Sequence, residues 1–339
     1  MIKKVRICNY KCYGPRGADF NLSKINFIFG DNSAGKSTFL QFLDKIYDIC
    51  NLDGKCDSAR LDKYLYKRKE GAISAKLRVC EDRDVHPVEA TWDFKKSESG
   101  EYTLRDSTTG GLVGLDKLRG ILPAKGLKPI VHVVANRKST ATMGTEKTSL
   151  EEQLERLVDD ATFASERDGV NDILMRLGIP YSCVMGDDGK SVSRVMIRDN
   201  DFNINLPRSE VGTGIDGLFD LAITLNAWEG GILAIEEPET NVNEEQLDSL
   251  MNVLVEEAMK RPVGQLFVEC HSELMFLELR NILKQGGLKL DDVSIIVVQK
   301  SANGSIATQI SMDRFGNILS PWPGGFFPKR VSITDAYYK

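Results

Sequence analysis

The chain carries Gly30-Asp31-Asn32-Ser33-Ala34-Gly35-Lys36-Ser37, a complete G-x-x-x-x-G-K-[ST] phosphate loop. The apolar residues 25–29 precede it and are predicted to form a buried strand, and residues 38–46 follow with apolar side chains at helical spacing. In this strand–loop–helix context, backbone N–H groups close around phosphate oxygens and the helix N-terminus adds positive charge. The sequence therefore predicts a nucleoside triphosphate site, with an ordinary glycine-rich turn as the alternative.

Each residue type in this loop has a predicted task. Lys36 is expected to reach the β- and γ-phosphates, and the Ser37 hydroxyl is expected to coordinate Mg²⁺. The predicted cofactors are therefore ATP and Mg²⁺. The residues expected to contact the nucleotide from this segment are Gly30, Asn32, Ser33, Ala34, Gly35, Lys36, Ser37 and Thr38.

A second motif lies at the end of another apolar strand, residues 231–235, which runs into Glu236-Glu237-Pro238-Glu239. Glu236 is expected to hold the Mg²⁺ through water, and Glu237 to orient or deprotonate the attacking water. The alternative is a solvated first helical turn, which Pro238 and Glu239 suit. His271 directly follows the next predicted strand and is expected to hydrogen-bond the γ-phosphate, with a purely structural histidine as the alternative.

Composition limits the class of protein. The 339 residues, 42% hydrophobic and 27% charged, suit one large α/β domain or two lobes. A net charge of -5 gives no global positive field, so any nucleic-acid contact is expected to be local or supplied by a partner. Seven scattered cysteines argue against a disulfide framework, and no signal peptide or membrane-spanning run is recognised. We expect a cytoplasmic protein with no membrane partner.

The second half of the chain alternates strands and helices, which predicts a parallel sheet with helices on its faces. An antiparallel β layer is expected within residues 51–110, and a helix over residues 149–177. The other predicted strands are residues 5–13, 18–22, 129–135, 265–269 and 294–299. Two short strands are also predicted around the turns 186–189 and 199–201. The other predicted helices are residues 244–260 and 273–284.

The order of these motifs, with a signature-like Val211-Gly212-Thr213-Gly214 between them, resembles the ABC-type ATPases of the SMC, RecF and OLD class. The opening residues 2–7 and 9–11 are similar to the opening of this class. The ending, residues 313–317 followed by 322–327, resembles the tail of small stand-alone AAA ATPases of this class, often encoded in bacterial phage-defence and mobile-element loci. The resemblance implies an α/β P-loop NTPase of ABC-ATPase type, with a mixed β-sheet core, an antiparallel β layer and a helical lobe carrying the signature. It implies one head over 1–339, with a nucleotide-binding lobe (1–140 and 220–339) and a helical lobe with a small β hairpin (141–219).

The resemblance also implies a homodimer in which two heads sandwich two ATP molecules. Gly212, Gly214 and Asp216 of one head would cap the nucleotide of the other, Arg137 would lie in the switch segment, and residues 241–244 would cross the interface. The family signature usually has a serine where this chain has Asp216. A carboxylate about 4 Å from a triphosphate costs on the order of 4 kcal/mol at an effective dielectric near 20. Asp216 is therefore expected to turn away, to be protonated or to weaken ATP-driven dimerisation, and we expect a slow ATPase.

The implied function is a sensor or regulator of a separate effector, such as a nuclease, a toxin or a reverse-transcriptase-associated protein, in anti-phage defence. A DNA-repair or DNA-loading ATPase and a largely non-hydrolysing scaffold or inhibitor remain alternatives. A GTPase is disfavoured because residues 136–139 lack the aspartate of N-K-x-D, and a transporter subunit because Ser37 and Gly212 lie far apart.

The sequence leaves open whether the protein binds nucleic acid. Residues 63–69 form the best basic and aromatic cluster for phosphate contacts, with an exposed amphipathic helix as the alternative. A nuclease on the same chain is disfavoured because Asp199-Asn200-Asp201 suits a hairpin turn and the chain has only three histidines.

Overall fold

A mixed six-stranded sheet forms the centre of the protein, with strand order β15-β14-β3-β13-β12-β8. Five strands are parallel, and β15 pairs antiparallel with β14 at the edge. The strands are β3 (Ile25–Phe29), β8 (Ile130–Val134), β12 (Gly231–Glu236), β13 (Gly264–Cys270), β14 (Val293–Gln299) and β15 (Ile306–Ile310). The predicted parallel sheet is therefore confirmed. The computed structural model describes residues 1–66, 71–81, 88–123, 130–134, 160–187, 193–240 and 242–324.

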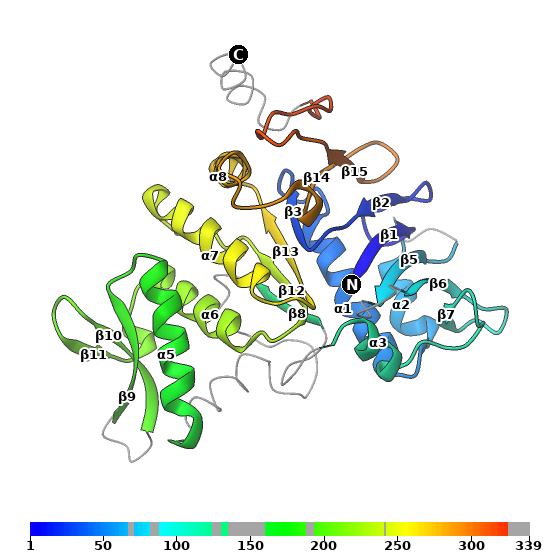
Figure 1. Ribbon diagram of the computed structural model, residues 1–339. Helices are drawn as coiled ribbons and strands as arrows, with labels where there is room; N and C mark the ends of the chain where they lie inside the picture. The colour runs from blue at the N-terminus through cyan, green and yellow to red at the C-terminus, as the bar shows by residue number, and fades with distance from the viewer. Residues whose placement is uncertain are drawn as a thin grey trace.

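Both faces of this sheet are covered, which explains the almost unbroken apolar sequence of its strands. In β3, Phe27 and Phe29 belong to one core, while Ile28 belongs to a second core on the opposite face. Helix α1 (Lys36–Asn51) contributes its apolar stripe to the second core. The first core includes residues of α6 (Thr213–Ala227), α7 (Leu247–Met259) and α8 (Glu273–Lys284) (Figure 1). Helix α7 directly follows the short turn η4 (Glu244–Gln246).

A second, antiparallel sheet packs on the α1 side, with strand order β2-β1-β5-β6-β7-β4. It confirms the antiparallel layer predicted within residues 51–110. The N-terminal strands join the same sheet, because β1 pairs with both β2 and β5. The elements of this region are β1 (Ile2–Cys8), β2 (Ala18–Asn21), β4 (Lys55–Cys56), α2 (Ser58–Leu61), η1 (Asp62–Tyr64), β5 (Ser74–Glu81), β6 (Val88–Lys96), β7 (Tyr102–Asp106) and α3 (Leu115–Ile121).

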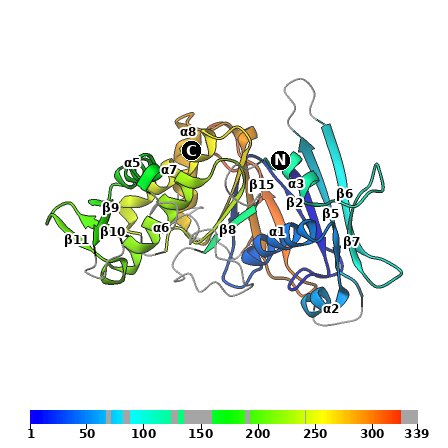
Figure 2. The same cartoon turned by 90° about the horizontal axis from the view of Figure 1, so that it is seen from below.

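A small lobe lies at the far end of the molecule from the antiparallel sheet (Figures 1 and 2). It contains α5 (Asp160–Arg176) and three antiparallel strands, β9 (Tyr181–Asp187), β10 (Ser193–Asp199) and β11 (Ile204–Leu206), where the sequence predicted two. The Asp199 carboxylate accepts hydrogen bonds from the backbone N–H groups of Asp201 (3.0 Å) and Phe202 (3.1 Å), which makes this segment the predicted turn. Residues 149–159 of the predicted helix lie outside the described residues.

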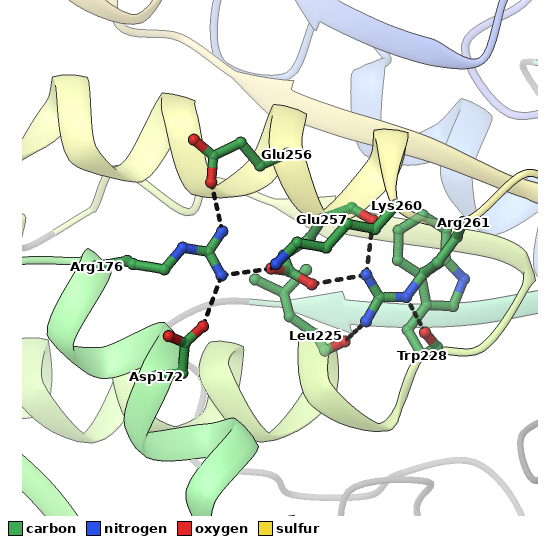
Figure 3. Close-up of polar contacts among 8 residues, drawn as sticks. All are labelled: Asp172, Arg176, Leu225, Trp228, Glu256, Glu257, Lys260 and Arg261. Atoms are coloured by element: carbon green, nitrogen blue, oxygen red, sulfur yellow. Dashed lines mark hydrogen bonds and ion pairs between the residues drawn. The ribbon is translucent and has the colours of Figure 1, made fainter.

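A network of charged side chains around the buried Glu257 joins α5 to α7 (Figure 3). Arg176 of α5 donates to Glu257 Oε1 (2.6 Å), and Arg261 donates to Glu257 Oε2 (2.7 Å) and to the Leu225 carbonyl (2.6 Å). Burial raises the pKa of the Glu257 carboxyl, but hydrogen bonds from Lys260, Arg261 and Arg176 outweigh burial and lower this pKa to about 2. Glu257 is therefore ionised and shared between two helices.

Among the helices that the structure describes, none combines the length and the apolar character needed to cross a bilayer.

Candidate nucleotide-binding site

The phosphate loop leaves β3 in a conformation that ordinary residues rarely adopt. Gly30 has φ 151°, Ser33 φ 60° and Gly35 φ 119°. A Cβ atom at Gly30 would lie 2.2 Å from the Val298 carbonyl oxygen, so this position needs glycine for close backbone approach as well as for its φ angle. The glycines of the motif therefore shape the loop, as the sequence predicted.

Two side chains that are distant in sequence form hydrogen bonds to the backbone carbonyls of the loop. The Tyr13 hydroxyl donates to the Gly35 carbonyl (2.6 Å), and Ser305 Oγ donates to the Ala34 carbonyl (2.5 Å). Burial raises the pKa of Tyr13 well above its usual value, so the phenol stays protonated and remains a donor. The sequence analysis missed both residues.

Lys36 begins α1, and its ammonium group folds back over the loop. Nζ donates to the carbonyl oxygens of Gly30 (2.9 Å) and Asp31 (3.2 Å), and the side chain is only 3% exposed. Ser37 and Thr38 follow in the first turn of α1. The lysine charge is thus placed at the loop where a phosphate oxygen would lie.

The tips of β12 and β13 bring carboxylates to the same place. In the parallel register Glu236 is opposite Glu269, and Ser37 Oγ donates to Glu269 Oε1 (2.8 Å). Lys36 Nζ lies 3.7 Å from the same oxygen. Burial and, next, the charge of Glu236 raise the pKa of Glu269 to about 7, while Ser37 and Lys36 oppose the rise. Glu269 thus lies among the predicted site residues, and the sequence analysis missed it because it was taken only as the end of an apolar strand.

Glu237 and His271 lie together at the next position along this edge. Glu237 has a left-handed backbone, φ 49°, and its N–H donates to the Glu269 carbonyl (2.7 Å). His271 Nδ1 lies 3.8 Å from Glu237 Oε1 and 3.5 Å from Glu239 Oε1. Glu239 also accepts from the backbone N–H groups of His271 (2.9 Å) and Ser272 (3.3 Å), so it positions the histidine loop. Burial raises the pKa of Glu239.

The signature residues occupy the start of α6, where Gly212 is the N-cap and Gly214 lies in the first turn. Asp216 is not left unpaired: Arg208 Nε donates to its Oδ1 (2.7 Å), and the same guanidinium pairs with Asp220. Burial is the main reason that the pKa of Asp220 is raised to about 6. Arg208 was not recognised from the sequence, and it offsets the charge that was expected to oppose a triphosphate.

Some predicted residues lie outside the described part of the chain. These are Arg137 in the switch segment, Asn241 at the start of the interface loop, and residues 67–69 of the basic cluster. Their assignments remain predictions. Lys63 and Tyr64, the described start of the basic cluster, form a short 3-10 turn instead of an amphipathic α-helix.

The donor set fits a magnesium–nucleotide complex better than a metal held by protein alone. Among the described residues, no three His, Cys, Asp or Glu side chains are arranged to hold a metal ion. Mg²⁺ usually takes one or two protein ligands and completes its shell with phosphates and water. The buried Oε2 of Glu269 has no hydrogen-bond partner in the described structure and can accept from such a water.

Comparisons with known proteins agree with this geometry. The sequence model of the AAA ATPase domain matches residues 1–166. No curated protein matches the chain. Among solved structures, an SMC head bound to the C-terminal winged-helix domain of ScpA has a TM-score of 0.63 at 14% identity, covering 92% of this chain and 98% of the other.

Two further SMC heads share the fold. The SMC head domain from Thermotoga maritima has a TM-score of 0.55 at 15% identity, covering 92% of this chain and 99% of its own. An SMC head from Pyrococcus furiosus, bound to the C-terminal domain of ScpA, has a TM-score of 0.60 at 14% identity, covering 100% and 99%. The fold is that of an ABC-type P-loop ATPase. More particularly it is the fold of the SMC head domains, so the fold class that the resemblance implied is confirmed.

Proposed function

We propose that the protein binds Mg·ATP between the phosphate loop and the tips of β12 and β13, and hydrolyses it slowly. The observation that carries the proposal is the 2.8 Å contact from Ser37 Oγ to Glu269, which lies in register with Glu236. In this assignment Lys36 binds the β- and γ-phosphates, and Ser37 and Glu236 hold the metal. The bound Mg²⁺ would neutralise charge on the phosphates.

Glu237 is the proposed catalytic carboxylate. Its side chain is 39% exposed, so water can reach it, and His271 lies close enough to link it to the γ-phosphate. Glu237 would accept a proton from the attacking water, and His271 would donate a hydrogen bond to the terminal phosphate. Glu239 keeps the histidine loop in place through its two backbone contacts.

The proposal extends to a head-to-head homodimer around ATP that regulates a separate effector protein, in bacterial anti-phage defence. Residues 141–219 would form the signature lobe and the remainder the nucleotide-binding lobe of one cytoplasmic head. SMC heads of this fold have been solved with ScpA bound, which supports a protein partner. Turnover strongly stimulated by DNA would instead favour a repair or loading ATPase, and negligible turnover with a tightly bound protein would favour a scaffold.

Equilibrium binding of ATP with and without magnesium tests the site. Lys36→Ala removes charge-assisted hydrogen bonds and is expected to weaken Mg·ATP binding by about 10- to 100-fold. The control is Lys45→Ala, because Lys45 lies further along the same helix, paired with Asp48, and this variant should bind as wild type does. Failure of the wild-type protein to retain Mg·ATP, or equal effects of the two substitutions, would contradict the proposal.

A further inference from the structure

The strand order gives Glu269 a special position among the acidic residues of the site. β13 lies between β3 and β12, so it is the direct neighbour of the strand that leads into the phosphate loop. Neighbouring strands are about 4.8 Å apart, and Glu236 on β12 is therefore about twice as far from β3 as Glu269 is. The carboxylate nearest to the loop comes from the strand that precedes the histidine, and not from the doubly acidic strand.

The contacts of Glu269 are directed at Ser37. The 2.8 Å hydrogen bond comes from Ser37 Oγ, whereas Lys36 Nζ is 3.7 Å away and donates instead to two loop carbonyls. A serine hydroxyl has one proton and two lone pairs. When the proton is given to Glu269, the lone pairs are left to face a cation on the other side of the oxygen.

The second oxygen of Glu269 points to the same role. Glu269 is 2% exposed, and its Oε2 is buried without a hydrogen-bond partner among the described residues. A buried acceptor of this kind normally has a partner in the functional state. Water molecules in the shell of a magnesium ion are donors of the right chemistry.

We propose that Glu269 is a positioning residue of the magnesium site, which orients Ser37 Oγ and accepts a hydrogen bond from a water on the cation. The inference rests on the proposed function, because it requires Mg·ATP to bind at the phosphate loop. It adds a residue from β13 to the predicted pair of Ser37 and Glu236.

The test measures metal dependence instead of turnover. A non-hydrolysable ATP analogue is titrated with Mn²⁺, and bound metal is followed by electron paramagnetic resonance in wild type, Glu269→Gln and the control Glu278→Gln. Glu278 is a half-buried residue of α8 whose carboxylate accepts a hydrogen bond from Asn281. Loss of an outer-shell partner typically weakens metal affinity about 10- to 100-fold, and we expect this loss for Glu269→Gln alone. Metal-free nucleotide binding should change by no more than about twofold.

A double-mutant cycle shows whether Glu269 acts through Ser37. If it does, Ser37→Ala combined with Glu269→Gln should weaken metal binding by less than the two single losses together, because only the water contact of Glu269 is left to lose once Ser37 has been replaced. Wild-type metal affinity in Glu269→Gln, or fully additive losses, would overturn the inference. If Glu269→Gln does not fold, as judged by circular dichroism, Glu269→Asp is used. Aspartate keeps the negative charge on a shorter side chain, so this variant should also bind the metal more weakly. Failure of the wild-type protein itself to bind the analogue would instead remove the proposed function.

Discussion

Arg208 changes what the unusual signature residue means. An unpaired Asp216 facing a triphosphate would oppose ATP-driven dimerisation, but the guanidinium of Arg208 lies between Asp216 and Asp220 and offsets their charge. The pair is partly exposed, so its attraction is weakened by solvent. At the scale of single residues, Arg208 reduces the negative charge of this pair of aspartates, and in the proposed function it would limit the charge presented to the nucleotide of a facing head.

This leads to a prediction about turnover. Asp216→Ser is expected to raise the ATPase rate by less than about tenfold, well short of the factor that an unscreened carboxylate would imply. Arg208→Gln is expected to lower the rate by more than Asp216→Ser raises it, because it leaves two aspartates without their cation. Steady-state phosphate release measures both.

The double variant Arg208→Gln, Asp216→Ser provides the control. It should recover part of the rate lost in Arg208→Gln, since one of the two uncompensated charges is gone. Unchanged rates in all three variants would show that the signature charges have no influence on hydrolysis.

At the scale of secondary-structure elements, a network of ion pairs joins α5 to α7. Arg176 and Arg261 meet at one buried carboxylate, Glu257, while a second acceptor of Arg176, Glu256, is 57% exposed. Two glutamates next to each other in sequence are thus expected to contribute differently to the free energy of unfolding. The buried one is shared by cations from two segments, and the exposed one is screened by water.

Glu257→Gln is expected to lower the free energy of unfolding by about 3 kcal/mol at pH 7, from a pKa reduced from 4.5 to about 2. Because the folded state depresses this pKa, the stabilisation is complete above the unfolded value and is lost as the pH falls towards about 2. The difference between wild type and variant should therefore shrink below about pH 4. Urea unfolding at a series of pH values measures it.

Glu256→Gln is the matched control for this experiment, and should cost less than about 1 kcal/mol at every pH. Equal losses for both variants would mean that burial of Glu257 does not matter to the junction.

The sequence predicted the elements that carry strong periodicity and missed those that depend on pairing. Helix α8 spans Glu273–Lys284 as expected, because a capping serine and an apolar stripe mark it locally. β15 was missed because Ile306–Ile310 mixes polar and apolar residues at a sheet edge. Likewise, the hydrogen bonds of Tyr13 and Ser305 to the loop span 22 and 271 residues, and no local pattern indicates them.

At the scale of the whole molecule, nucleotide is expected to control association between heads. In the proposed function, the signature on α6 serves a facing copy, while Lys36 and Glu237 serve the copy that carries them. Within the described chain, Asp216 pairs with Arg208.

Glu237→Gln should bind Mg·ATP but remain dimeric, because the proposed water-activating carboxylate is lost while the metal and phosphate contacts are kept. Multi-angle light scattering is expected to show a dimer for this variant with ATP and a monomer with ADP. Lys36→Ala should stay monomeric with either nucleotide. A Glu237→Gln protein that binds ATP and yet stays monomeric would contradict the sandwich arrangement.

The two side chains behind the phosphate loop have a consequence for biosynthesis. The loop follows the third strand, but its backing comes from Tyr13 on one side and from Ser305 on the other. The strand that leads into it is also flanked by β13 and β14, which are translated much later. A nascent chain therefore cannot complete the hydrogen bonds behind its phosphate loop until Ser305 has emerged from the ribosome, and under the proposed function an unfinished polypeptide would not bind ATP.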